Sequence, residues 1–408
     1  MKIWIKVLLG VIIGASLGGY LPEAGAADFF RAAAELVINI GYYVLFPLVF
    51  FSFTVGIFEL RKENLTLRVL GRGVLYVLAA TFLLVIIGIA SVVLLAPDRI
   101  PIIIEKESHF SVPGVGEILK SVFPRNIFTV FTGSGSFLLP IYVFALFLGM
   151  NFTFDRSISR PVVQLFDAFS RILYHGNKFL VEILGLGMIA LTANMVFTVN
   201  RIPQFELFGQ LLLLLSINAV FILFGVFPLL LYFLGGKENP YKWLYGIITP
   251  LAAAAVSGDA YFTLMSLIHH GRENLGVSRR VGSALFPLYA MFGKAGSAMV
   301  TGIAFVVILK SYSSLGLTVS AVLWVMVFSF LVSFLTGPFP GSAVFIGLAL
   351  LCSWYGRGIE EGYLILRPVL PLLISYGVVL DTATAAFAGL LAARHEDQHH
   401  EIFMKDYV

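Results

Sequence analysis

The chain has little charge and almost no cysteine. Only 12% of its 408 residues are Asp, Glu, Lys or Arg, about half the share of roughly 25% that is usual in soluble domains. The single cysteine, Cys352, excludes an intrachain disulfide and a cysteine metal cluster. The small net charge of +4 is spread along the chain and argues against a nucleic-acid partner. No nucleophile elbow, phosphate-binding loop or metalloprotease motif is present, so we predict no enzyme, cofactor or metal site.

Apolar residues dominate instead. They make up 59% of the chain, and the mean hydropathy is +0.94, so most of the surface is expected to face lipid. We predict an all-α polytopic membrane protein with eight transmembrane helices. These helices are expected near 3–22, 32–59, 70–96, 137–154, 162–198, 205–234, 281–310 and 361–393.

Two further apolar segments are interrupted near their middle. Residues 243–268 break at 255–259, and residues 312–355, which carry no charge, break at 336–342. The second segment is about twice the length that crosses a bilayer once. Backbone leaves helical form at membrane depth only where protein or water satisfies it. We therefore predict two re-entrant helical hairpins, which are typical of the binding site of a secondary transporter.

Basic residues predict the orientation. Lys2 and Lys6 precede the first helix, and most other basic residues fall in loops of the same side. The positive-inside rule makes that side cytoplasmic, together with both termini, in a plasma (inner) membrane. The two hairpins then enter from opposite sides, as inverted repeats produce. His269 and His270 are expected in a solvated loop after the first hairpin, and the histidines of tail 395–408 are likewise expected in solvent.

Several motifs together resemble one family. Pro47-Leu48-Val49-Phe50-Phe51-Ser52-Phe53 with Gly56 looks like its second helix, and Phe123-Pro124-Arg125-Asn126-Ile127-Phe128 with Leu146-Phe147-Leu148-Gly149 like its fourth. Val162-Val163 with Phe166-Asp167-Ala168-Phe169 looks like its fifth helix, and Phe339-Pro340-Gly341 like the tip of its second hairpin. In order and spacing these resemble the dicarboxylate/amino acid:cation symporters, the glutamate transporter homologues. The resemblance implies a homotrimer of elevator-type transporters.

The resemblance also implies a division of the chain. Residues 1–236 would hold six helices, of which 1, 2, 4 and 5 form a static scaffold and 3 and 6 join the moving transport domain. Residues 237–394 would form the core transport region, and 395–408 a cytoplasmic tail. The core would contain hairpin 1 (243–268), helix 7 (281–310), hairpin 2 (312–355) and helix 8 (361–393).

The sequence departs from the family where sodium is bound. Where the family's seventh helix breaks at Asn-Met-Asp-Gly-Thr, this chain reads Gly293-Lys294-Ala295-Gly296-Ser297. The break survives through its glycines, but the carboxylate and amide ligands do not. Hard cations such as sodium take oxygen ligands. We therefore expect transport without sodium coupling.

The last helix can be aligned in two ways. If Asp381 matches the family's amine-binding Asp, then Thr384, Ala388 and Ala392 stand where an Arg or neutral residue, an Asn and a second Asp occur. If Asp381 matches the second Asp, then Gly377 replaces the Asn and Leu373 the Arg. Both alignments remove the Arg, and hairpin 1 has Ala255 where some members carry one. A substrate side-chain carboxylate usually needs an Arg, so a neutral substrate is favoured.

The predicted substrate site combines the hairpin tips with charged residues of the last two helices. Tip groups at helix N-termini would receive a carboxylate, Asp381 would bind the amino group, and Thr384 would face the side chain. These predicted substrate-binding residues are Ser257, Gly258, Asp259, Pro340, Gly341, Ser342, Asp381 and Thr384.

Lys294 has the most unusual position of the charged residues. It falls near the middle of a membrane helix, where insertion of a lysine costs about 2.5–3.5 kcal/mol. We interpret its ammonium as a tethered substitute for a bound sodium ion, with Asp381 and nearby carbonyls as partners. Alternatively it carries a coupled proton.

These observations favour a secondary transporter of a small, neutral amino acid, working by alternating access without sodium. The alternative is a proton-coupled symporter of dicarboxylates or acidic amino acids, in which Lys294 meets the second carboxylate. A channel or a membrane scaffold is disfavoured, because a scaffold has no need of charged residues beside broken helices. Partners would be the small-molecule substrate, the lipid bilayer and two further copies of the chain.

Overall fold

The computed structural model describes the chain except residues 102–114, 125, 127, 129–130, 132–137, 154–155, 237–238 and 313–316. Helices make up nearly all regular structure in these described ranges, beside one isolated bridge between Val277 and His399. Within the described part of the chain, seven helical segments are long and apolar enough to cross a membrane, which makes the chain an integral membrane protein. They span Ile3–Tyr20, Gly25–Lys62, Thr66–Leu95, Ile158–Asn200, Phe205–Leu234, Arg279–Tyr312 and Gly362–His395.

One of the eight predicted spans is shorter than expected. In place of a helix over 137–154, the structure has α6 (Leu139–Asn151), which contains 13 residues. At 1.5 Å per residue it is about 20 Å long, less than the roughly 30 Å of a hydrocarbon core. The predicted irregular region before it lies largely outside the described residues, apart from the short helix α4 (Val115–Val122).

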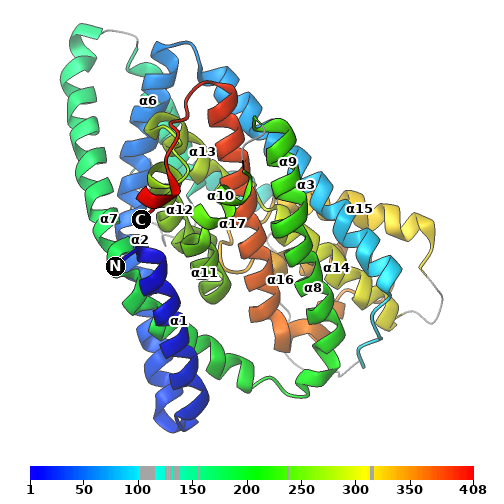
Figure 1. Ribbon diagram of the computed structural model, residues 1–408. Coiled ribbons are helices and arrows are strands. Elements are labelled where there is room, and N and C mark those ends of the chain that lie inside the picture. The colour runs from blue at the N-terminus through cyan, green and yellow to red at the C-terminus, as the bar shows by residue number, and fades with distance from the viewer. Residues whose placement is uncertain are drawn as a thin grey trace.

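The N-terminal helices pack on one another at one side of the molecule (Figure 1). Helix α1 (Ile3–Tyr20) and helix α2 (Glu23–Lys62) both lie along the long helix α7 (Arg156–Asn200), and α6 contacts α2. Small residues permit the closest approach, because a Cβ atom added to Gly10 of α1 would lie 2.2 Å from the carbonyl oxygen of Gly185 in α7. Such close contact of small residues is typical of helix pairs in membranes.

The opposite side is formed by α3 (Thr66–Leu95), α8 (Gly209–Phe221) and α9 (Phe227–Leu234) (Figure 1). A single π-helical turn, Ile222–Val226, joins α8 to α9, and the 3₁₀ turn Phe205–Phe208 precedes α8. The core lies between the two sides. Its centre is the segment Arg279–Tyr312, in which 94% of the most apolar window is buried, against 28% for α1.

The core segment is broken into α13 (Arg279–Phe292) and α14 (Ala295–Tyr312), as its two glycines predicted. Helix α14 packs on α3 and on α17 (Leu370–His395), which follows the 3₁₀ segment Gly362–Val369. The predicted helix over 361–393 is thus found as two consecutive helical pieces.

Both interrupted segments form helical hairpins. After the short helix α10 (Tyr241–Gly246), α11 (Ile248–Ser257) and α12 (Ala260–Glu273) pack on each other and are joined at Gly258 and Asp259. Gly258 has φ +60°, a left-handed conformation that glycine adopts without strain. Helices α15 (Val319–Ser333) and α16 (Ala343–Tyr355) also pack together. The predicted breaks are found; how the hairpins enter the membrane stays a prediction.

The expectation for His269 and His270 is wrong. Both lie within α12, which continues to Glu273, and their exposed fractions are 0% and 1%. Neither is in a solvated loop, because α12 packs against α2, α7, α13 and α17 over this length. The sequence pattern did not indicate the last turn of α12, since polar residues begin before the helix ends.

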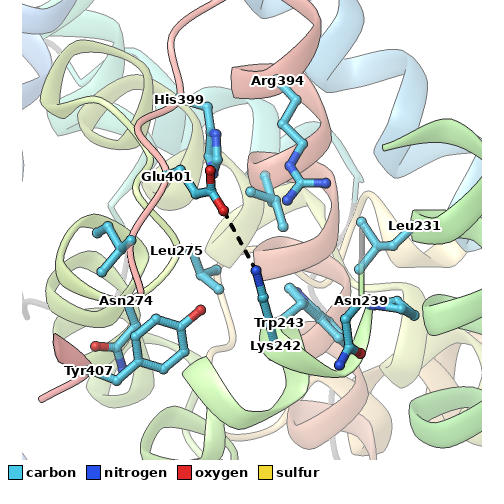
Figure 2. A pocket seen from close by; sticks show the side chains of 13 residues that line it. Leu231, Asn239, Lys242, Trp243, Asn274, Leu275, Arg394, His399, Glu401 and Tyr407 are labelled. Carbon is cyan, nitrogen blue, oxygen red and sulfur yellow. Dashed lines mark ion pairs between the residues drawn. The ribbon is translucent and has the colours of Figure 1, made fainter. Parts of the chain in front are cut away.

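The C-terminal tail leaves His395 and His400 exposed, as predicted, while its backbone bonds to the core. The amide of His400 donates to the Gly276 carbonyl at 2.9 Å, and the amide of Val408 donates to Asn274 Oδ1 at 3.0 Å. Tyr407, which follows the 3₁₀ turn Met404–Asp406, is 5% exposed and stacks on Tyr245. Figure 2 shows the small pocket, about 30 Å³ in volume, that the tail closes. Its wall includes the ion pair of Lys242 Nζ and Glu401 Oε1, 3.6 Å apart.

Candidate functional site

The break between α13 and α14 lies directly against α17. A Cβ atom added to Gly296 would lie 2.3 Å from Leu380 Cβ and 2.5 Å from the Gly377 carbonyl oxygen. Only glycine fits at such a distance. The first turn of α14 is therefore held against the middle of α17, where Asp381 is located.

Asp381 is used as a helix cap. Its Oδ1 accepts a hydrogen bond from the Ser297 amide at 2.9 Å, and its Oδ2 accepts one from the Ser297 hydroxyl at 2.6 Å. Asp381 is 4% exposed. A carboxylate at the first turn of a helix satisfies free amides and complements the helix dipole. Asp381 thus stabilises the N-terminus of α14 in this conformation.

Asp259 performs the same task for α12. Its Oδ1 accepts from the amides of Tyr261 at 2.9 Å and Phe262 at 2.8 Å, a common N-cap arrangement. Its Oδ2 accepts from the hydroxyl of Tyr42 in α2 at 2.6 Å. The tip of hairpin 1 is therefore bonded to a helix of the N-terminal group.

The tips of the two hairpins touch. The Ala260 amide donates to the Pro340 carbonyl at 3.3 Å, and the Tyr261 hydroxyl donates to the Gly337 carbonyl at 2.9 Å. A Cβ atom on Gly341 would lie 3.3 Å from Asp259 Oδ2. The structure therefore brings Gly258, Asp259, Pro340 and Gly341 together; their role in binding a substrate stays a prediction.

The two tip serines differ in their surroundings. The Ser257 hydroxyl donates to the Ala253 carbonyl at 2.7 Å and accepts from the Asp259 amide at 3.2 Å, so it closes its own turn. Ser342 precedes α16, and its side chain makes no capping hydrogen bond to that helix. The N-terminus of α16 thus lacks the side-chain cap that α12 and α14 have.

Thr384 does not face an opening in this conformation. It is 0% exposed, and its hydroxyl donates to the Leu380 carbonyl one turn earlier in α17 at 2.7 Å. A role in contacting a substrate side chain stays a prediction that requires the site to open.

Lys294 stands between these groups without a partner. The residue is 0% exposed, and among the residues that the structure describes its Nζ has no hydrogen-bond partner. Asp381 and, more weakly, Asp259 exert an electrostatic attraction on it. The hydrogen bond with Asp381 expected from the sequence is not found among the described residues; both oxygens of that carboxylate accept from Ser297.

Two residues of this site were missed from the sequence. Tyr42 and Ser297 bond the two carboxylates, yet they lie 217 and 84 residues from them in the chain. A tyrosine or serine in an apolar helix is too common to indicate such a partner. The sequence contains a weak indication for Ser297, because it belongs to the glycine-containing break at 293–297. It contains none for Tyr42.

Comparison with known proteins agrees with this architecture. The model of the sodium:dicarboxylate symporter family matches residues 3–394, so the chain belongs to that family, whose members are transporters and not enzymes. The chain is 22% identical over 347 residues to "Neutral amino acid transporter B(0)" of Bos taurus, covering 74% of this chain and 64% of that protein.

A second relative matches over the whole chain. "Proton/sodium-glutamate symport protein" of Geobacillus stearothermophilus is 20% identical over 425 residues, covering 100% of this chain and 96% of the relative. The match thus spans less than two thirds of the cattle transporter and nearly all of the bacterial symporter. The two names differ in substrate.

Proposed function

We propose that the chain is a secondary transporter that moves a small, neutral amino acid across the membrane by alternating access, without sodium coupling. The observation that carries this proposal is the meeting of both hairpin tips with the α13–α14 break around Asp259, Lys294 and Asp381. Buried polar groups at broken helices in a membrane protein mark a substrate pathway. The name of the cattle relative supports a neutral substrate.

The wider arrangement belongs to the same proposal. The hairpins would be re-entrant and of opposite direction, and the α1, α2, α6 and α7 group would be the scaffold against which the core moves. The assembly would be a homotrimer in a plasma membrane with both termini in the cytoplasm. Each of these follows from the family pattern and from the basic residues of the loops.

Independence from sodium rests on missing oxygen atoms. At the places where the family's ligands are expected, the side chains are those of Gly293, Ala295, Ala388 and Ala392. The two alanines of α17 are 0% exposed, and an alanine side chain offers no ligand to a hard cation. The residues present do not fit a sodium site of that kind.

Uptake into proteoliposomes tests the proposed substrate and coupling. Labelled alanine or serine should accumulate, and unlabelled alanine should compete better than aspartate or succinate, because a second carboxylate would be buried without an Arg partner. Replacing sodium by potassium or choline at constant ionic strength should leave the rate unchanged. Saturable dependence on sodium, or uptake of succinate with alanine inert, contradicts the proposal.

A second candidate is a proton-coupled symporter of an acidic substrate. It is favoured by the unpaired ammonium of Lys294, which offers one positive charge to a second carboxylate, and by the name of the bacterial relative. The same uptake assay separates the candidates: an acidic substrate driven by an inward proton gradient, with neutral amino acids inert, supports this one.

A further inference from the structure

Lys294 is the one charged side chain of the site whose surroundings are incomplete. It precedes the first residue of α14, is 0% exposed, and its Nζ finds no hydrogen-bond acceptor in the described part of the chain. An ionised amine buried in this way is costly unless an acceptor completes its surroundings. The side chain cannot be explained by exposure at the membrane surface, because none of it is exposed.

The two neighbouring carboxylates are already engaged. Both oxygens of Asp381 accept from Ser297, and those of Asp259 accept from Tyr42 and two amides of α12. They attract Lys294 at a distance but make no hydrogen bond to it. In this conformation the described residues therefore supply no hydrogen-bond acceptor to the Lys294 ammonium.

The electrostatics of the site favour an anion. Helices α12, α14 and α16 all begin close to the hairpin tips and the break, and each N-terminus contributes about half a positive charge. Asp259 and Asp381 cap the first two helices, whereas α16 has no side-chain cap. When the two carboxylates are counted against the Lys294 ammonium and the three helix N-termini, about half a positive charge remains, and α16 is the helix without a side-chain cap.

We propose that Lys294 is the residue that binds the carboxylate of the transported substrate, through a direct ammonium–carboxylate contact. This inference rests on the proposed function as a carrier of small carboxylate-bearing molecules, and it names the recognising residue. The fixed charge of Lys294 supplies the positive charge that a captured cation would otherwise bring to the site. Substrate binding therefore requires no sodium. Lys294 thus still acts as a tethered cation, as interpreted from the sequence. Its ion-pair partner, however, is the substrate carboxylate and not Asp381.

The test compares acids with their amides on the purified full-length protein. Thermal shift is recorded with L-alanine, L-alaninamide, succinate and succinamate, because a ligand of the native state raises stability with its concentration and affinity. In the wild-type protein the acid that is transported should bind about 10- to 150-fold more tightly than its amide, the range expected for a hydrogen bond to a charged group. Lys294→Met should remove that difference, and Lys294→Arg should retain part of it.

Lys310→Met is the matched control. Lys310 lies in the last turn of α14, the helix that Lys294 precedes, so its removal changes the charge by the same amount away from the site. This variant should keep the wild-type preference for the acid. Without ligand, Lys294→Met should unfold at the same or a higher temperature than the wild type, because its ammonium has no bond to lose.

The outcomes separate this inference from the proposed substrate. If succinate binds through Lys294 and alanine does not, the inference stands and the neutral substrate is wrong. If Lys294→Met binds alanine as the wild type does, the inference is wrong and the neutral substrate stands. If the amides bind the wild-type protein as tightly as the acids, the inference is wrong whatever the folding of the variants.

Discussion

At the scale of single residues, the two acidic side chains of the site are caps of neighbouring helices. Charged residues in apolar helices drew attention to Asp259, Lys294 and Asp381 in the sequence, because such residues are expensive in a membrane. What the sequence could not provide were their contacts. The partners lie on helices far away in the chain, and only the packed structure brings Ser297 to Asp381 and Tyr42 to Asp259.

The bond between Ser297 and Asp381 leads to a test of stability. Ser297→Ala removes the hydroxyl donor at 2.6 Å from Asp381 Oδ2, and we expect a loss of about 1.5–3 kcal/mol, the value for a hydrogen bond to a charged group. Ser329→Ala is the control, since Ser329 is 0% exposed and its hydroxyl has no partner among the described residues. Equal unfolding temperatures of the two variants would show that the bond contributes nothing.

Thr384 provides a prediction about specificity. Its hydroxyl is bonded within α17, and the Leu380 carbonyl that accepts it belongs to the same helix. If this conformation is kept in the bound state, Thr384→Val should leave amino acid affinity within about twofold, because the lost hydrogen bond lies within α17 and no substrate contact is lost. A larger loss, measured by thermal shift with alanine and serine, would mean that the hydroxyl turns toward the substrate.

At the scale of helices, the breaks were the best predicted features. Glycine, proline and serine interrupt apolar runs for reasons of backbone geometry, and the structure places the turns at Gly258–Asp259, at 334–342 and at Gly293–Lys294. The sequence was less informative where no such residue marks an end. Helix α12 continues through His269 and His270, and the π turn at 222–226 carries no pattern that distinguishes it from an α-helix.

The contact between α14 and α17 can be tested with one methyl group. Gly296→Ala would place a Cβ atom 2.3 Å from Leu380 Cβ, so one helix must shift; overpacking of this kind costs about 1–3 kcal/mol. The unfolding temperature should fall, and the affinity for alanine should decrease. Gly71→Ala in α3 is the control, because nothing lies within 4 Å of its added Cβ and alanine is the better helix former.

At the scale of the whole molecule, the backbone contacts of the C-terminal tail were not predicted from the sequence. A polar sequence with several histidines predicted a solvated segment, and His395 and His400 are exposed. The segment is also bonded by its backbone to the turn after α12, including a hydrogen bond of 2.9 Å from the Ser278 amide to the Gln398 carbonyl. Backbone pairing of this kind leaves almost no trace in side-chain composition.

Removal of residues 397–408 tests whether the tail holds that turn. Hydrogen exchange at the Ser278 amide should rise, because its acceptor Gln398 is removed. The Gly293 amide, bonded to Tyr289 at 2.7 Å within α13, should exchange as slowly as before. Unchanged exchange at Ser278 would show that the turn keeps its shape without the tail.

The two carboxylate oxygens of Asp259 accept hydrogen bonds from different helices. Oδ1 belongs to hairpin 1, since it bonds only amides of α12, and Oδ2 faces Tyr42 on α2. Separation of this hairpin tip from α2 would therefore break the Tyr42 hydrogen bond of Asp259 and leave the cap of α12 intact. Water entering at the parted surfaces can take the place of the Tyr42 hydroxyl. The fold of the hairpin tip therefore does not depend on the oxygen that bonds α2.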